Sequence, residues 1–330
     1  MILVISSKHV YAAKRLLQES KSRNLELGIM DVGDLVAREF EVNPKDYQAL
    51  YVRDPYLKGS PEYIPKIIRL AKNFKAAGKK VVDAVIANGE LGRGKWADYE
   101  RLIKAVLPIP ETNLLSGYKL NAKRYPLILK WTYGFKGKHT FLVKDEAEFH
   151  PLTQKYPAKE LLVQEFIPAE FEYKIITVGY KALPVVLRFK IKNSGFRADF
   201  KKYEIIQTPT TSPPLAGLLL DPTSHKASSD LRKEERLRGI SKDNRGASPP
   251  LLRRGGSEAD GVVGADKIKE LTHLAEQSSR VLKRELAKVD ILESRGKFYI
   301  LEVNRFPGLK SFEEFTKYNA TKEFLEYLSR

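Results

Sequence analysis

Three oxygen-bearing side chains near the C-terminal end of the sequence have a spacing that suits a divalent cation. Glu302 and Asn304 are two residues apart in an apolar run, so both side chains lie on one face if this run forms a strand. Asp290 belongs to the preceding apolar run, which can pair with it as an antiparallel neighbour. Mg²⁺ prefers such oxygen donors, so we expect a magnesium site that bridges nucleotide phosphates. Carboxylates on a solvated sheet face would be the alternative, but the flanking apolar residues fit it poorly.

A lysine at the end of another apolar run could bind phosphate. Lys130 follows Pro126-Leu-Ile-Leu and precedes the segment Trp131-Thr-Tyr-Gly-Phe-Lys-Gly-Lys138. An ammonium group beside a glycine-containing hairpin can hold phosphate oxygens together with backbone amides. Taken alone, an ordinary hairpin turn with solvated lysines is the more frequent arrangement.

Two polar residues interrupt the apolar run Val163-Gln-Glu-Phe-Ile167. Polar groups inside a strand are costly to bury unless they are paired, and an adenine edge is one such partner. An edge strand with its polar face toward water explains Gln164 and Glu165 equally well.

Familiar nucleotide and hydrolase motifs are missing from the sequence. Gly89-Glu-Leu-Gly-Arg-Gly94 has the wrong spacing for a dinucleotide fingerprint, and Gly134-Phe-Lys-Gly-Lys138 lacks the spacer of a P-loop. No HExxH or GxSxG motif occurs, which disfavours metal-dependent hydrolysis and serine acyl transfer.

The secondary structure expected to position these residues changes along the chain from alternating strands and helices to antiparallel hairpins. Strands expected at 2–5, 49–52 and 80–83 alternate with helices expected at 9–19 and 64–77, as in a parallel α/β layer. A helix over 95–105 follows. From residue 126 onward, the pattern predicts antiparallel hairpins that pair 126–130 with 140–143 and 175–178 with 183–191, and a strand over 161–167. A helix over 265–287 and strands over 289–292 and 297–303 complete the pattern.

A segment over about 208–262 breaks this regularity. It contains the motif Ser-Pro-Pro-Leu twice and several polar, serine-rich runs. We expect a disordered insertion, derived from a translated repeat element, that divides the last lobe. Deletion of 210–260 should leave folding and activity intact, and loss of both would contradict this origin.

Composition limits the class of protein further. The 330 residues include 58 Lys and Arg against 41 Asp and Glu, which gives a formal net charge of +17, so polyanions are attracted. On composition alone, a solvated basic surface without a dedicated partner is the first interpretation of this charge. No cysteine is present, which excludes disulfides, thiolate metal sites and cysteine nucleophiles. The short apolar N-terminal run predicts a first strand, not a signal peptide or membrane span, so we expect a cytoplasmic protein.

The order of these elements resembles the ATP-grasp superfamily, and most closely its RimK-like carboxylate–amine ligases. The motifs that carry the resemblance are VQEFIP, Asp290 together with LEVNRFPGL, and GKWADYERLIKAVLPIPET. It covers nearly the whole chain outside the insertion. The implied fold is α/β, with an N-terminal pre-ATP-grasp domain over 1–94, a small ATP-grasp lobe over 95–163 and a C-terminal lobe over 164–330.

The resemblance also implies roles for individual residues. Asp290, Glu302 and Asn304 would bind the metal, and Arg188 and Arg197 would be catalytic, near the transferred phosphate and the acyl phosphate. The expected ATP-binding residues are Lys95, Lys130, Gly134, Gly137, Gln164, Glu165, Phe166, Ile167, Glu172 and Lys174. Lys174 stands where the family usually has arginine, and Arg305 and Phe306 replace small residues after the asparagine.

The implied activity is an ATP-dependent ligation that joins a carboxylate and an amine through an acyl phosphate, with ATP and Mg²⁺, or Mn²⁺ in its place. The alternative is a basic nucleic-acid or ribosome-associated binding protein that keeps the fold without ligase activity. A third hypothesis joins the two observations: the basic surface recruits an acidic peptide or protein tail as a substrate.

Overall fold

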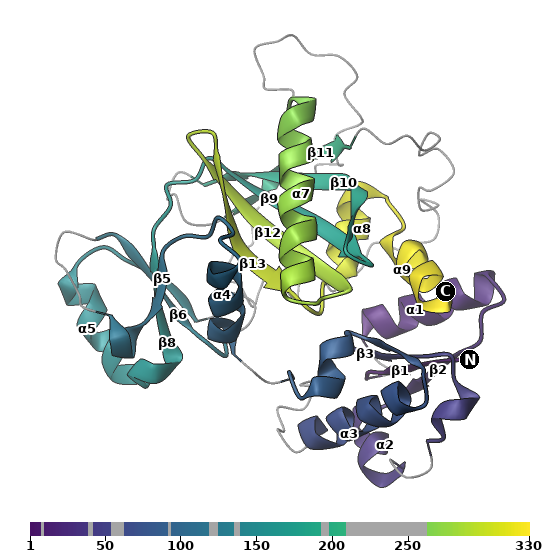
Figure 1. Cartoon of the computed structure of the whole chain (residues 1–330). Helices are drawn as coiled ribbons and strands as arrows, with labels where there is room; N and C mark the ends of the chain where they lie inside the picture. The colour runs from purple at the N-terminus through teal and green to yellow at the C-terminus, as the bar shows by residue number, and fades with distance from the viewer. Residues whose placement is uncertain are drawn as a thin grey trace, which may run out of the picture.

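A computed structural model describes residues 1–7, 10–38, 42–53, 63–91, 94–118, 125–134, 139–192, 198–208 and 263–330 (Figure 1). These residues form three sheets, each flanked by helices. Within the described residues, no helix has the length and apolar character needed to cross a membrane.

The N-terminal sheet is parallel, with strand order β2-β1-β3-β4. Its strands are β1 (Ile2–Ile5), β2 (Leu27–Met30), β3 (Ala49–Val52) and β4 (Lys80–Val82), and its helices are α1 (Tyr11–Ser22), α2 (Val32–Arg38) and α3 (Tyr63–Ala76). All four residues of β1 and of β3 are buried, as expected for strands covered on both faces. The expected parallel layer is confirmed.

Two groups of helices cover this sheet. Helices α2 and α3 and the short 3₁₀ helix η3 (Ala84–Asn88) pack on one face. Helix α1 and the two C-terminal helices, α8 (Leu309–Thr316) and α9 (Ala320–Ser329), pack on the other. The chain therefore returns to its N-terminal domain at its end.

The second sheet is smaller and antiparallel, with order β5-β8-β6-β7. Its elements are α4 (Lys95–Lys104), β5 (Thr112–Leu114), β6 (Leu127–Trp131), β7 (Thr140–Val143), α5 (Glu146–Lys155) and β8 (Leu161–Glu165). Because β8 lies between β5 and β6, the edge-strand interpretation of Gln164 and Glu165 is wrong. We call this sheet and α5 the small lobe.

The third sheet is antiparallel, with order β11-β10-β9-β12-β13, and α7 packs along one face (Figure 1). Its elements are β9 (Phe171–Val178), β10 (Lys181–Ile191), β11 (Ala198–Gln207), α7 (Ala265–Val281), β12 (Leu286–Ser294) and β13 (Lys297–Asn304). Strands β12 and β13 pair with a register shift, because Asp290 opposes Glu302 while Ile291 opposes Ile300. Leu301 is therefore the extra residue of a β-bulge. We call this sheet and α7 the large lobe.

The antiparallel hairpins expected from the sequence are confirmed, with β6 pairing β7 and β9 pairing β10. Helix α7 ends at Val281, six residues before the expected end, because Lys283 adopts a positive φ of 51° and β12 begins at Leu286. The expected insertion at 208–262 lies outside the described residues apart from Thr208. The division at 94 and 163 stays a prediction, and β8 runs across the second boundary.

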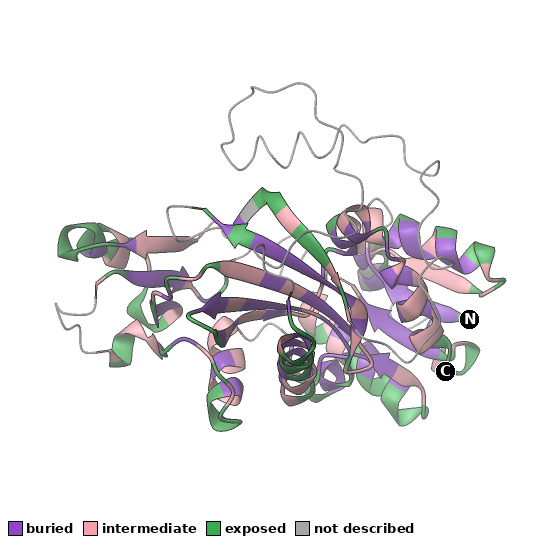
Figure 2. Cartoon of the chain, turned by 90° about the horizontal axis from the view of Figure 1, so that it is seen from above, coloured by how far each residue is buried: buried purple, intermediate pink, exposed green. Residues whose placement is uncertain are grey.

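Burial follows the layers. In Figure 2 the strands of the sheets are largely buried, while the helices expose their outer faces. Among the buried charged residues are Lys130, Asp290 and Arg188, so the sheets carry polar groups as well as apolar ones.

Candidate active site

A cluster of charged side chains lies on the face of the large lobe that α7 does not cover. Asp290 on β12 opposes Glu302 on one neighbouring strand and Lys174 on the other. Lys288 opposes Asn304 two positions along. Directly opposed residues of a sheet project from the same face, so the register brings these five side chains together.

Asp290 is the most enclosed member of the cluster. Its Oδ2 accepts a hydrogen bond from Asn304 Nδ2 at 3.1 Å and lies 3.2 Å from Lys288 Nζ. Its Oδ1 is buried and has no hydrogen-bond partner among the described residues, with Lys174 Nζ at 3.7 Å. Burial raises the pKa of Asp290, although both lysines act in the opposite direction. The carboxylate therefore keeps one oxygen available for a further cationic partner.

Glu302 forms an ion pair with Lys95, the first residue of α4. Burial alone would raise the pKa of Glu302, but Lys95, and then Lys130, lower it to about 2. Glu302 is thus an anion at any physiological pH.

Lys130 lies near the same position from the side of the small lobe. It is 6% exposed, and its Nζ donates a hydrogen bond to the hydroxyl of Tyr99 at 3.2 Å. Burial lowers the pKa of Lys130 to about 7, and repulsion by Lys95 contributes in the same direction. A nearby phosphate would favour the charged form of this lysine.

Lys174 and Glu172 project into the cluster from β9 and form an ion pair. Burial opposes the charge of Lys174, but Asp290 and Glu172 raise its pKa above the usual value. A lysine therefore provides the positive charge at the position where the resemblance leads us to expect an arginine, but without the planar fork of a guanidinium group.

The start of α4 is tied closely to the end of β6. Lys95 N donates to the carbonyl oxygen of Thr132 at 3.0 Å, and Trp96 N donates to Thr132 Oγ1 at 3.2 Å. A Cβ atom on Gly94 would lie 2.4 Å from Thr132 Oγ1, so only glycine fits this approach. The sequence analysis included Gly94 in a poorly spaced glycine motif and as the first residue of GKWADYERLIKAVLPIPET, but it assigned no role to Gly94 and missed that of Thr132.

The glycine loop is described only in part. Gly134 N donates to the carbonyl oxygen of Trp131 at 2.9 Å, and a Cβ there would lie 3.0 Å from the same oxygen. Gly137 and Lys138 lie outside the described residues.

The segment expected to contact adenine follows β8 toward the large lobe. Gln164 is buried, and its Nε2 donates to Thr112 Oγ1 at 2.7 Å. Glu165 N donates to the carbonyl oxygen of Glu111 at 2.8 Å, while its side chain is exposed. Ile167 is buried and Phe166 is half-buried. The polar pair thus has partners inside the small lobe.

Arg188 is not brought together with the cluster, and its catalytic role stays a prediction. Its neighbour Leu187 opposes Lys174, so by the alternation of a strand Arg188 projects from the other face. There it pairs with Glu204 and lies 4.4 Å from the ring centroid of Phe171. Arg197, the second expected arginine, lies outside the described residues.

The chemistry of the donor set fits Mg²⁺. Asp290 and Glu302 offer carboxylate oxygens, Asn304 offers an amide oxygen, and the unsatisfied Asp290 Oδ1 lies among them. No group of three or more histidine, cysteine or acidic side chains in the described part of the chain could hold a metal, so the third donor here is the amide.

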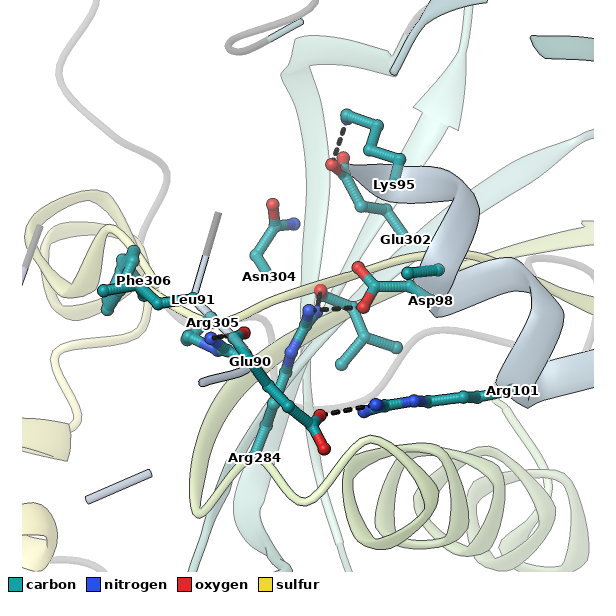
Figure 3. A pocket seen from close by; sticks show the side chains of 12 residues that line it. Glu90, Leu91, Lys95, Asp98, Arg101, Arg284, Glu302, Asn304, Arg305 and Phe306 are labelled. Carbon is teal, nitrogen blue, oxygen red and sulfur yellow. Dashed lines mark hydrogen bonds and ion pairs between the residues drawn. The ribbon is translucent and has the colours of Figure 1, made fainter. Parts of the chain in front are cut away.

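A pocket of about 230 Å³ adjoins this cluster (Figure 3). It lies where the end of β13 meets α4 and the loop after η3, and Lys95, Glu302 and Asn304 belong to its wall. Three arginines also line the pocket, and each forms an ion pair with an acidic residue. The pairs are Arg284 with Asp98 at 2.7 Å, Arg101 with Glu90 at 2.5 Å, and Arg305 with Asp83 at 3.1 Å. The cavity therefore has both cationic and anionic walls.

Comparison with known proteins identifies the fold. Residues 254–328 match the model of the RimK-like ATP-grasp domain. The structure superposes on the ATP-grasp ligase PsnB, complexed with a precursor variant, Mg and ADP, with a TM-score of 0.62, 13% identity and coverage of 99% of this chain and 97% of that one. The chain has the ATP-grasp fold. The resemblance found in the sequence is thereby confirmed.

Two further proteins match this chain over almost their whole length. A probable alpha-L-glutamate ligase of Haemophilus influenzae strain KW20 is 20% identical over 352 residues, which cover 99% of this chain and 96% of the relative. The RimK domain ATP-grasp protein of Sphaerobacter thermophilus superposes with a TM-score of 0.55 at 15% identity, and all of both chains is covered.

Proposed function

We propose that this protein is an ATP-dependent carboxylate–amine ligase that forms a C–N bond through an acyl phosphate. The observation that carries the proposal is the convergence of Asp290, Glu302 and Asn304 on one face of an ATP-grasp sheet, with Lys95 and Lys130 beside them. Relatives named as ligases support this activity.

Asp290, Glu302 and Asn304 would hold Mg²⁺, for which Mn²⁺ is the alternative ion. When bound, the ion offsets charge on the nucleotide phosphates during phosphoryl transfer. Lys130 and Lys95 would bind phosphate oxygens, and Gln164 to Ile167 would contact adenine. Lys174 and Glu172 would keep the charge of the sheet face balanced around Asp290.

The proposed reaction has two steps. A substrate carboxylate oxygen attacks the γ-phosphorus of ATP, so that the bond to the β-γ bridging oxygen breaks and ADP leaves. The amine nitrogen then attacks the acyl carbon, inorganic phosphate leaves, and the nitrogen loses a proton as the amide forms. Positioning and positive charge are what such transfers need from the protein, and the lysines of the cluster provide them.

We propose that the carboxylate and amine enter through the pocket beside Glu302. Its arginines, together with the excess of basic residues in the chain, suit an acidic amino acid, peptide or protein tail. The names of the glutamate ligases and the precursor peptide bound by PsnB are consistent with substrates of this class. A cytoplasmic location is part of the proposal because ATP is a substrate.

The alternative, a basic nucleic-acid or ribosome-associated binding protein, gains no support from the comparisons. The cluster also argues against it, because a protein that only used its basic surface would have no need of the three oxygen donors.

A thermal shift of the purified protein with ATP, with and without Mg²⁺ and with GTP as a control, tests the proposal. A ligand at about a hundredfold excess over its Kd stabilises the native state by about 2.7 kcal/mol. We expect a shift that depends on Mg²⁺ and is specific to ATP, followed by release of ADP when acids and amines are screened. A protein that shows no ATP-dependent shift would contradict the proposal.

A further inference from the structure

Tyr99 lies between the small and the large lobe, on the inner face of α4. It follows Lys95 by four residues, so the two side chains lie on the same face of the helix. Its side chain is 4% exposed, although it carries a polar hydroxyl. A buried hydroxyl needs hydrogen-bond partners, and this one has a partner from each lobe.

On the side of the large lobe, Tyr99 OH donates to the carbonyl oxygen of Leu301 at 2.7 Å. Leu301 is the bulge residue of β13 and has no partner residue on β12. It also directly precedes Glu302, so the phenol satisfies the backbone where the bulge sets the direction of a proposed metal ligand.

On the side of the small lobe, the same oxygen accepts the hydrogen bond from Lys130 Nζ at 3.2 Å. A phenol has one hydrogen to donate, and here Leu301 receives it. The direction of that bond fixes where the lone pairs of the oxygen point, and Lys130 lies there. Burial raises the pKa of Tyr99 to about 12, so the hydroxyl keeps its hydrogen.

We propose that Tyr99 is a positioning residue for nucleotide binding: anchored on the bulge of β13, it holds the ammonium group of Lys130 at a fixed place relative to Glu302. This inference rests on the proposed function, because it assumes that Lys130 binds a phosphate of ATP. In this role, Tyr99 aligns Lys130 of the small lobe with Glu302 of the large lobe.

The substitution Tyr99→Phe tests the inference because it removes the hydroxyl and keeps the ring. Tyr125→Phe is a matched control, since the hydroxyl of Tyr125 in the small lobe is buried without a hydrogen-bond partner among the described residues. Affinity for ATP is measured by calorimetry in the full chain, well below the melting temperature of each variant. We expect Tyr99→Phe to weaken ATP binding roughly tenfold, as for a buried hydrogen bond to a charged group, and Tyr125→Phe to leave it unchanged.

A double-mutant cycle separates positioning from general stability. If Tyr99 acts through Lys130, the variant Tyr99→Phe/Lys130→Met binds ATP as weakly as Lys130→Met alone. Additive losses would overturn the inference, as would an unchanged affinity of Tyr99→Phe. The double variant leaves no ammonium group buried at this position. Its comparison with Lys130→Met therefore still tests the inference if Tyr99→Phe alone fails to fold.

ATP binding by the wild-type protein distinguishes a failure of the proposed function from a failure of the role proposed for Tyr99. If it does not bind ATP, the proposed function is refuted and the role of Tyr99 with it. If it binds ATP and Tyr99→Phe binds equally well, only the role of Tyr99 is refuted.

Discussion

At the residue scale, the cluster is defined by how its charges compensate one another. Glu302 is paired with Lys95, while Asp290 has Lys174 and Lys288 at its two oxygens. A buried charge that loses its partner is destabilising by several kcal/mol, whereas a neutral isostere removes the charge and keeps the shape. Substitutions at this site should therefore be isosteric.

The variant Glu302→Gln tests the metal site directly. Gln can still accept a hydrogen bond from Lys95, but its neutral amide binds a magnesium ion more weakly than a carboxylate does. We expect the Mg²⁺-dependent part of the ATP thermal shift to disappear and ATP turnover to fall by about 10²-fold or more. The melting temperature without nucleotide should stay within a few degrees of the wild type.

The control is Glu270→Gln, which removes the same charge on the exposed side of α7. Its ATP shift should match that of the wild type. Retention of a full Mg²⁺-dependent shift in Glu302→Gln would remove Glu302 from the site.

The residues of the cluster were predictable where strand periodicity alone determines the face. The two-residue spacing of Glu302 and Asn304 predicted that they share a face, and the expected antiparallel pairing of their strand predicted that Asp290 lies beside them. The resemblance did not take strand parity into account, and by that parity Arg188 projects from the opposite face of the sheet to the cluster. Tyr99, an apparently ordinary core aromatic of an amphipathic helix, was not predictable because its partners come from two other segments.

At the element scale, α4 connects all three parts of the molecule. Its first residue is bonded to Thr132 in the small lobe and paired with Glu302 in the large lobe, and Arg101 pairs with Glu90 after η3. The pocket lies against this helix (Figure 3). A small displacement of α4 would therefore change both the nucleotide site and the pocket.

Gly94→Ala should produce such a displacement. The added methyl group would lie 2.4 Å from Thr132 Oγ1 and 3.2 Å from the ring of Tyr133, so α4 or Thr132 must move. We expect a loss of about 1–3 kcal/mol in the free energy of unfolding, measured by urea denaturation, together with weaker ATP binding.

Gly264→Ala is its counterpart at the start of α7. Gly264 also precedes a helix, and a Cβ there meets no atom within 4 Å. This substitution should change stability by about 0.5 kcal/mol or less. Equal effects of the two substitutions would show that the approach of α4 to β6 is unimportant.

A second link between elements joins β4 and β12 through two carboxylates. Asp83 accepts a hydrogen bond from the backbone N of Glu285 at 2.8 Å, and Glu285 accepts one from the backbone N of Ala84 at 2.9 Å. Burial raises the pKa of Asp83 to about 6, and burial with repulsion by Asp83 raises the pKa of Glu285 to about 7.

These shifts predict the sign of a pH effect. In the unfolded chain both groups titrate near pH 4, so the folded protein binds protons more tightly between about pH 4 and pH 7. Their stabilising contribution is complete below pH 4 and is lost as the pH rises through 6 and 7. We expect Glu285→Gln to melt a few degrees higher than the wild type at pH 8, and to show a smaller fall in melting temperature between pH 5 and pH 8.

The exposed Glu26 provides the comparison, because Glu26→Gln should follow the wild-type profile. Parallel profiles for Glu285→Gln and the wild type would mean that Glu285 is ionised in both folded and unfolded states at these pH values.

The elements themselves were largely predictable, and the exceptions have physical reasons. The apolar runs of β1, β3 and β6 are continuous, so their positions were clear from the sequence. Strand β2 (Leu-Gly-Ile-Met) and the three-residue β5 are too short to show a period, and α5 contains Pro151, which hides its helical pattern. The two short strands form because neighbouring strands pair with them, and this pairing is not visible in a local sequence pattern.

At the scale of the whole molecule, the N-terminal domain and the C-terminal helices form one core. Ile2, Val4 and Tyr51 pack with Phe324 and Leu325 in a single apolar cluster. Around it, Arg15 on α1 lies 2.8 Å from Glu19 and 3.5 Å from Glu313 on α8, and all three side chains are buried. The two ends of the chain lie close together as a result (Figure 1, Figure 2).

Arg15→Met should therefore destabilise the whole protein and not only α1. It leaves the buried carboxylate of Glu313 without its arginine, while Glu19 keeps only Arg23. Loss of one partner of a buried pair costs about 3–5 kcal/mol. We expect a single unfolding transition at lower urea concentration, in both near-UV and far-UV circular dichroism. The exposed neighbour Lys14 gives the control Lys14→Met, and a loss of similar size in both variants would contradict a role for the buried network.

The shared core also sets an order for biosynthesis. The face of the N-terminal sheet that carries Ile2, Val4 and Tyr51 is covered in part by α8 and α9, which follow all three sheets in the sequence. During synthesis this part of the face therefore stays uncovered until both helices have left the ribosome. In that interval its apolar side chains are exposed to chaperones or to other nascent chains.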